Sequence, residues 1–273
     1  MTMRYLLIVG VLALAGCGGG NPNAPSPTPS PSPSPPPTFS GTVTNTVSGA
    51  PVFGFSATIS NGRLVVSAPG YVTRDTRAGA LTVDLIPEAG FDVAFYRQFA
   101  RGTLEDPMQP LRVLPAAPSI YLQTEGLTAG DVIALEQAAR AAVPALSGDR
   151  FQVQAWETGA TARTPTTGWI VVTVTNDTAQ PCGLTNVGAS AGLVRLNSAS
   201  RCGFNGRTID PPLFAHELGH ALGFYHVAAS GHLMKPRATF AERTSVLPSD
   251  LERHHALIAY KRSAGNRDLD VDN

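Results

Sequence analysis

The chain has 273 residues, of which 43% are hydrophobic, and its 20 basic and 20 acidic side chains give a formal net charge of zero. This length and hydrophobic content suffice for one or two folded domains and exclude a wholly disordered chain. Because basic residues are not in excess, the composition lacks the electrostatic footprint of a nucleic-acid-binding protein, and we expect no nucleic-acid partner.

Residues 1–16 are predicted to be an export signal. A single charge, Arg4, precedes an apolar run over residues 5–15 that is too short to span a bilayer comfortably. The sequence Leu-Ala-Gly-Cys at residues 14–17 resembles the lipobox of bacterial lipoproteins. The resemblance implies cleavage before Cys17, attachment of lipid to that cysteine and anchoring to a membrane of the bacterial cell envelope. The alternative is an ordinary secreted protein with a chance cysteine at this position.

The next segment, residues 17–37, is predicted to be a spacer. Nine of residues 21–37 are proline, alternating mainly with serine, threonine and alanine. Such a composition cannot form a core and favours extended polyproline II at about 3.1 Å per residue. Behind a lipidated Cys17, the segment would hold the folded part of the chain away from the membrane. Gly18 in place of aspartate favours the outer membrane in the lipoprotein sorting rule, if the source has one.

Residues 38–87 are predicted to form a small all-β sandwich module. Short β-rich runs occupy residues 40–52, 54–59, 63–68 and 80–86, and Asn-Gly and Pro-Gly pairs mark turns between them. The run resembles the carboxypeptidase-regulatory-like, transthyretin-like module. The sequence contains no catalytic cluster here, so we expect a spacer or adhesion role.

Residues 88–265 are predicted to form a second, α+β domain. A helix is expected to begin at Thr128 with a capping box to Asp131, and Pro144 is expected to disturb or end it. The order of elements favours a mixed sheet with a helix packed on it. The other elements expected are a helix over 90–102 and strands over 118–124, 151–157, 169–177 and 191–197.

Two cysteines, Cys182 and Cys202, flank the last of these strands. If the chain is exported, they lie in an oxidising compartment, which favours a disulfide between them. Such a bridge would close a loop of about 20 residues and contribute roughly 3 kcal/mol in the chain-entropy account. The alternative is a pair of free buried thiols.

The segment that begins at Asp210 carries the chemistry. Asp210 is a good helix N-cap and Pro211 suits the first turn. His216 and His220 are four residues apart, so both project from one helix face and can bind one metal ion. Glu217 is then placed to polarise a water at the metal rather than to bind the metal itself.

A third histidine follows at a fixed spacing. Gly223 can end the helix with a positive φ and turn the chain, which brings His226 to a third ligand position. Three neutral imidazoles leave a fourth position of Zn²⁺ open, as catalytic rather than structural zinc sites do. Zn²⁺ is therefore the expected cofactor.

The pattern His-Glu-x-x-His-x-x-Gly-x-x-His over residues 216–226 resembles the signature of the metzincin zinc peptidases. Met234, in Met-x-Pro, resembles the methionine turn of the matrixin branch. The resemblance implies a metzincin-like zincin domain, in which a mixed sheet carries an active-site helix and a C-terminal helix, placed after the β-sandwich module. It further implies Zn²⁺ on the three histidines, Glu217 as general base and an endopeptidase acting on a protein or peptide substrate.

The substrate in that family lies along an edge strand, and residues 191–197 are the candidate edge. Two rival functions remain open. The chain could be a cell-surface binding lipoprotein with a non-catalytic zinc site, or a zinc hydrolase of a non-protein amide such as one in the cell wall.

The C-terminal part offers a helix and a short tail. Ser249 and Glu252 form a capping box that opens a helix over about 250–262, similar to the C-terminal helix of metzincins. His254 and His255 are interpreted as surface or packing residues because three ligands are already supplied, whereas the role of His232 is left open. The acidic tail, residues 266–273, is predicted to be a solvated end.

Overall fold

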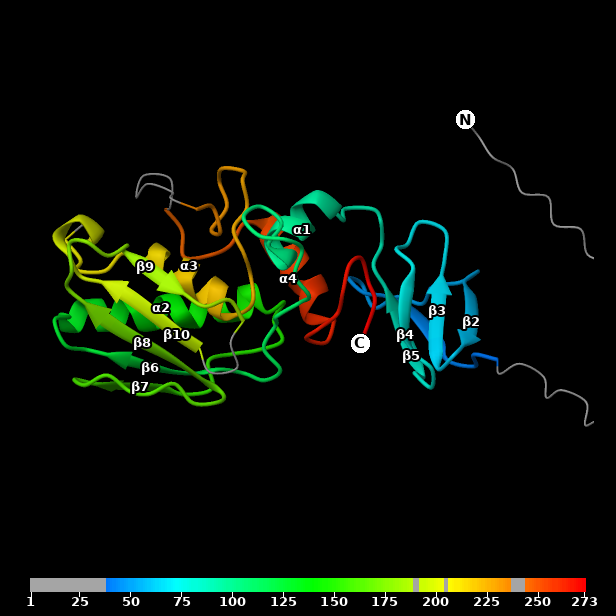
Figure 1. Cartoon of the computed structure of the whole chain (residues 1–273), viewed down its shortest axis with the longest axis horizontal. Helices are drawn as coiled ribbons and strands as arrows, with labels where there is room; N and C mark the ends of the chain where they lie inside the picture. The colour runs from blue at the N-terminus through cyan, green and yellow to red at the C-terminus, as the bar shows by residue number, and fades with distance from the viewer. Residues whose placement is uncertain (1–37, 189–191, 204–205, 237–243) are drawn as a thin grey trace, which may run out of the picture. The chain divides into compact units, whose positions relative to one another are not determined.

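The computed structural model describes residues 38–188, 192–203, 206–236 and 244–273 (Figure 1). Cys17, together with the predicted signal and spacer, lies outside these residues. Within the described ranges, no helix is both long enough and apolar enough to cross a membrane. The fold is mixed α+β.

The first part of the described chain is all-β. Two short strands pair in parallel, and three others form an antiparallel sheet in the order β2-β3-β4. Both sheets contribute to one small apolar core, in which Val43, Leu64 and Leu85 are almost wholly buried. The strands are β1 (Thr42–Asn45), β2 (Ser56–Ser60), β3 (Arg63–Ser67), β4 (Arg74–Arg77) and β5 (Thr82–Leu85).

Strand β4 was not among the predicted β-rich runs. Its sequence, Arg-Asp-Thr-Arg, is polar throughout and lacks the alternation of apolar residues that signals a strand. It forms because its backbone pairs with β3, with Val66 opposite Arg74.

The larger sheet has five strands in the order β7-β6-β8-β10-β9. The first four run parallel to their neighbours, and β9 runs antiparallel to β10, so the sheet is mixed. The strands are β6 (Ser119–Gln123), β7 (Trp156–Gly159), β8 (Trp169–Thr175), β9 (Gly183–Thr185) and β10 (Gly192–Asn197).

Two strand predictions need correction. The strand expected over 151–157 begins only at Trp156, and residues 151–155 are irregular. The candidate edge, residues 191–197, corresponds to β10, which is an internal strand between β8 and β9. The edge on this side is β9, a three-residue strand that was too short to show a periodic signal.

Four α-helices and one 3₁₀ turn occur among the described residues: α1 (Val93–Arg101), α2 (Ala129–Leu146), α3 (Pro211–Ala221), α4 (Asp250–Tyr260) and η1 (Ser200–Cys202). Helix α2 begins with the capping box between Thr128 and Asp131. It passes through Pro144 and ends two residues later. Helix α3 packs against α2 and against strands β9 and β10, so the helix that carries His216 and His220 contacts both a helix and the last two strands of the sheet (Figure 1).

The acidic C-terminal segment is not a solvated end, contrary to the prediction. Asp270 is 1% exposed and binds the buried guanidinium of Arg262 through two contacts of 2.6 Å. Asp272 pairs with Arg74 of β4 at 2.9 Å, and its backbone N–H donates to Asp75 at 2.8 Å. The tail is thus held by Arg262, eight positions before Asp270, and by Arg74, 198 positions before Asp272, and the acidic residues alone do not reveal either pairing.

Candidate metal centre

Helix α3 presents two histidines on one face. The side chain of Asp210 caps the helix by accepting from the backbone N–H of Leu213 at 3.2 Å, and Pro211 occupies its first position. The spacing of four residues places His216 and His220 one above the other, with ring centroids 4.8 Å apart. Both are nearly buried, at 4% and 7% exposure.

The third histidine reaches the same point through a glycine turn. Gly223 has φ +108, and a Cβ at this position would lie 2.7 Å from the carbonyl oxygen of Arg112. Only glycine tolerates both conditions. The turn returns the chain so that Nε2 of His226 lies 3.1 Å from Nε2 of His220 and 3.3 Å from Nε2 of His216.

The outer nitrogen of each ring is held by an oxygen. Nδ1 of His216 lies 2.7 Å from the carbonyl oxygen of Leu233, and Nδ1 of His220 lies 2.8 Å from that of Phe224. Nδ1 of His226 lies 2.8 Å from the carboxylate of Glu105. Because these oxygens can only accept hydrogen bonds, each Nδ1 is the donor, which leaves the Nε2 of each ring as the atom available to a metal ion.

The three nitrogens fit a metal ion. Tetrahedral zinc with Zn–N bonds of 2.0–2.1 Å requires ligand nitrogens about 3.3 Å apart, close to the separations of His226 from its partners. The ligand atoms of His216, His220 and His226 all lie within 4.8 Å of one another, so the group can hold a metal ion. A set of three protein ligands leaves one coordination position for water or substrate.

The side chain of Glu217 extends from α3 to the sheet edge at β9. Its side chain is 4% exposed, and its carboxylate accepts a hydrogen bond of 2.7 Å from the hydroxyl of Thr185 on β9. A Cβ on Gly183, two residues earlier on the same strand, would lie 2.2 Å from Oε1 of Glu217. The strand therefore makes room for the carboxylate at Gly183 and holds it at Thr185.

Met234 packs beneath the histidine helix. It is fully buried, and a Cβ on Gly219 would lie 2.4 Å from its sulfur, so the glycine allows the close approach. The preceding residue, Leu233, supplies the carbonyl oxygen that holds His216. The turn is thus both packed under the helix and bonded to one of the three rings.

Two of the three remaining histidines, His232 and His255, make contacts away from the three nitrogens. Nδ1 of His232 lies 2.7 Å from the hydroxyl of Ser249, and its ring packs against Phe95. His255 is wholly buried and stacks on Phe91. Neither belongs to the three-histidine group, in agreement with the interpretation of His255 as a packing residue.

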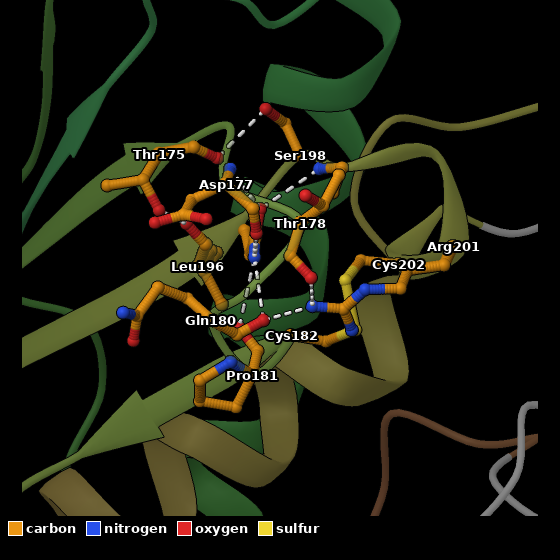
Figure 2. Close-up of a disulfide and its surroundings, with 12 residues drawn as sticks. Thr175, Asp177, Thr178, Gln180, Pro181, Cys182, Leu196, Ser198, Arg201 and Cys202 are labelled. Atoms are coloured by element: carbon orange, nitrogen blue, oxygen red, sulfur yellow. Dashed lines mark hydrogen bonds between the residues drawn. A yellow bond between two sulfur atoms is a disulfide. The ribbon is translucent and has the colours of Figure 1, made fainter.

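Cys182 and Cys202 form a disulfide with Cα atoms 5.3 Å apart, immediately before β9 and at the end of η1. Figure 2 shows Arg201 beside this bridge, where its guanidinium donates to the carbonyl oxygens of Thr178 and Gln180. The bridge and Arg201 fix the chain that leads into the sheet edge next to Glu217.

Three residues near the site escaped the sequence analysis. Glu105 and Thr185 belong to no motif, and Glu105 is 121 positions from the ring that it contacts. Glu252 was predicted only as a helix cap, but its carboxylate also binds the turn at Met234. The capping box with Ser249 was the one sequence signal for Glu252, and it predicted only the role of Glu252 in capping α4.

The fold and the site together define a mixed α+β protein with a candidate metal centre of three histidines. No family model matches the sequence, and no curated protein matches it. Among solved structures, the chain is similar to the crystal structure of metalloproteinase-II from Bacteroides fragilis, with 13% sequence identity, a TM-score of 0.35, and coverage of 81% of this chain and 85% of that chain. At that TM-score the match supports no conclusion about this chain.

Proposed function

We propose that the protein is a zinc-dependent endopeptidase of the metzincin type. The observation that carries the proposal is the convergence of three histidines: Nε2 of His226 lies at zinc-ligand spacing from Nε2 of both His216 and His220. The buried carboxylate of Glu217 lies next to His216 in the same helix. Three neutral nitrogen ligands and an adjacent carboxylate are the donor set and the base that metal-assisted hydrolysis requires.

The chain's own residues have distinct roles in this proposal. A zinc ion bound by the three histidines would lower the pKa of a water and polarise the scissile carbonyl. Glu217 takes a proton from that water and delivers it to the leaving amine. The hydroxyl of Thr185 keeps the carboxylate of Glu217 oriented during both transfers by donating to Oε2 at 2.7 Å.

Strand β9 replaces residues 191–197 as the proposed substrate-binding edge. Among the described strands, β9 pairs only with β10, so its other edge is open to a further strand. An extended protein or peptide substrate can pair with such an edge through its backbone. Because Gly183 and Thr185 face Glu217, a chain added to this edge would lie beside the base.

The proposed location is the bacterial cell envelope, where lipid on Cys17 would bind the protein to a membrane. The lipobox-like residues 14–17 and the proline-rich spacer support this proposal. The disulfide between Cys182 and Cys202 suits the oxidising conditions outside the cytoplasm.

The test is zinc content and peptide hydrolysis of the purified protein beside its Glu217→Ala variant. We expect one zinc per chain in both proteins, and cleavage only in the parent, abolished by chelator. Full activity of Glu217→Ala would overturn the role of the base. Zinc without cleavage of a broad peptide library would favour a binding lipoprotein, whereas activity on muropeptides alone would favour a hydrolase of non-protein amides.

A further inference from the structure

His226 differs from the other two histidines because it lies outside any helix. Its side chain is 23% exposed, and the backbone around it is irregular. Its position is set by the end of α1, a helix more than a hundred residues earlier. The backbone N–H of Tyr225 donates to Phe99 at 2.7 Å, and that of Ala228 donates to the side chain of Gln98 at 2.9 Å.

The chain after α1 is also fixed against the same segment. Gly102 ends the helix with φ 72, and a Cβ there would lie 2.8 Å from the ring of Tyr225. The carbonyl oxygen of Gly102 accepts a hydrogen bond of 3.0 Å from the backbone N–H of Asp106, which closes a tight turn containing Glu105. The N–H of Gln109 donates back to Arg101 at 2.9 Å. Glu105 is therefore presented by a backbone that is bonded at both ends.

The carboxylate of Glu105 is the outer partner of the third ring. Its Oε2 lies 2.8 Å from Nδ1 of His226, whereas His216 and His220 are held by neutral backbone carbonyls. A carboxylate that accepts from the outer nitrogen of a metal-binding histidine fixes the ring and raises its basicity. A backbone carbonyl fixes the ring but carries no net charge.

We propose that Glu105 is a positioning residue of the metal centre, which orients His226 through Nδ1 and strengthens Nε2 as a zinc ligand. This inference rests on the proposed metal site. In this arrangement, helix α3 supplies two ligands and the end of α1 fixes the third, so the site is completed by a segment outside the sequence motif.

The alternative is a surface ion pair without a role in metal binding. Glu105 is 55% exposed, and exposed ion pairs contribute little to folding stability. The two roles therefore differ in what they predict. A surface pair would leave both stability and zinc affinity nearly unchanged on removal, whereas a positioning residue would change zinc affinity and leave the metal-free protein as stable as before.

The experiment compares the parent protein with Glu105→Ala, Glu105→Gln and Asp106→Asn. Asp106 is exposed on the same turn, so Asp106→Asn removes one charge from the same turn and serves as the matched control. Zinc affinity is measured by competition with a chromophoric chelator, and thermal unfolding is measured on the metal-free proteins. We expect zinc affinity to fall by about 10- to 100-fold in Glu105→Ala. Glu105→Gln should lose less because an acceptor oxygen remains, and Asp106→Asn should match the parent.

Equal zinc affinity of Glu105→Ala and the parent would overturn the inference. An equal loss of zinc affinity in Asp106→Asn would also overturn it, because only the charge of the loop would then matter. A lower unfolding temperature of metal-free Glu105→Ala than of the metal-free parent would overturn it as well, because the loss of affinity would then follow from loss of folding stability. A His226→Ala variant separates this result from failure of the proposed function. If the parent binds zinc no better than His226→Ala, the metal site itself is wrong and the inference falls with it.

Discussion

Glu252 accepts a hydrogen bond of 2.8 Å from the backbone N–H of Met234, which joins the first turn of α4 to the turn beneath the histidine helix. The same carboxylate accepts from Leu233 at 3.0 Å and from Ser249 at 2.7 Å, and it is wholly buried. Because Leu233 in turn holds His216, one carboxylate supports both a helix cap and a ring of the metal centre.

The first prediction is that Glu252→Gln destabilises the protein strongly. The amide has one acceptor oxygen for three backbone donors, and its NH₂ group would face a backbone N–H. Leaving buried donors unsatisfied costs about 1–3 kcal/mol each, so we expect the free energy of unfolding to fall by roughly 2–4 kcal/mol. Urea denaturation of the metal-free protein measures this change.

Glu136→Gln is the control for this prediction. Glu136 lies on α2 in an exposed pair with Arg140, where an ion pair contributes only about 0.3–0.5 kcal/mol. If Glu252→Gln lowers the free energy of unfolding no more than Glu136→Gln does, the carboxylate does not support the turn.

The second prediction concerns Thr185, whose hydroxyl donates to Glu217. Thr185→Val keeps the shape of the side chain but removes the donor. A hydrogen bond to a charged group contributes about 1.5 kcal/mol, so turnover should fall about tenfold. Thr185→Ser should keep most of the activity, and zinc content should be the same in all three proteins. Steady-state peptide hydrolysis checks this, and equal turnover of Thr185→Val and the parent would exclude the contact as a support for the base.

The part of the site that the sequence predicted is the part encoded locally. Helical periodicity places His216 and His220 on one face, and a glycine at residue 223 returns the chain to His226. These inferences need only a few neighbouring residues. The ring contacts of Glu105 and the hydroxyl of Thr185 depend on which distant segments meet, and that is decided by packing of the whole domain.

Two of the errors in the fold arise from contacts that a local sequence pattern does not specify. Residues 192–197 are apolar at several positions and predict a strand, but their place inside the sheet depends on pairing with both β8 and β9. The acidic residues 270 and 272 suggest a solvated tail until Arg262 and Arg74 are placed beside them. Arg74 lies 198 positions before Asp272, so a local charge pattern does not reveal that pair, whereas Arg262 lies only eight positions before Asp270 and meets it because of how the chain between them folds.

The third prediction is that the disulfide stabilises the sheet edge. The bridge joins residues 20 positions apart, and Cys182 directly precedes β9 (Figure 2). Loss of the cross-link in a Cys182→Ser, Cys202→Ser double variant should lower the free energy of unfolding by about 3 kcal/mol in the chain-entropy account. Because β9 holds Glu217, turnover should fall more than zinc affinity.

The measurement for the disulfide is thermal unfolding of the parent with and without reductant, beside the double variant. The variant should not respond to reductant, and the reduced parent should resemble it. A parent whose unfolding temperature and turnover are the same in both states would show that the cross-link does not support β9.

The fourth prediction is a loss of stability as the pH falls below the ordinary pKa of histidine, due to His255. Burial lowers the pKa of the His255 imidazole below its usual 6.5. The structure explains the preference for the neutral ring, because Nδ1 lies 2.8 Å from the carbonyl oxygen of Leu251 and Nε2 accepts from the backbone N–H of Asp92 at 3.2 Å. A second ring proton would face that N–H group.

The sign follows from linkage. Below pH 6.5 the unfolded chain binds a proton at His255 while the folded chain does not. The contribution of His255 to the free energy of unfolding is therefore fully present above pH 6.5 and declines as the pH falls toward the pKa of the folded state. His255→Gln retains an acceptor for Asp92 and cannot titrate. We expect the drop in unfolding free energy between about pH 7.5 and pH 5.5 to be smaller in His255→Gln than in the parent.

The control for the pH prediction is the neighbouring His254→Gln, since burial also lowers the pKa of the His254 imidazole. His254 is less buried than His255 and stands beside it on α4, so its removal should reduce the pH dependence less. Urea denaturation of the three metal-free proteins, the parent and the two variants, at both pH values gives one drop in unfolding free energy for each protein. If His255→Gln shows the same drop as the parent, the acid sensitivity arises from groups other than the buried ring of α4.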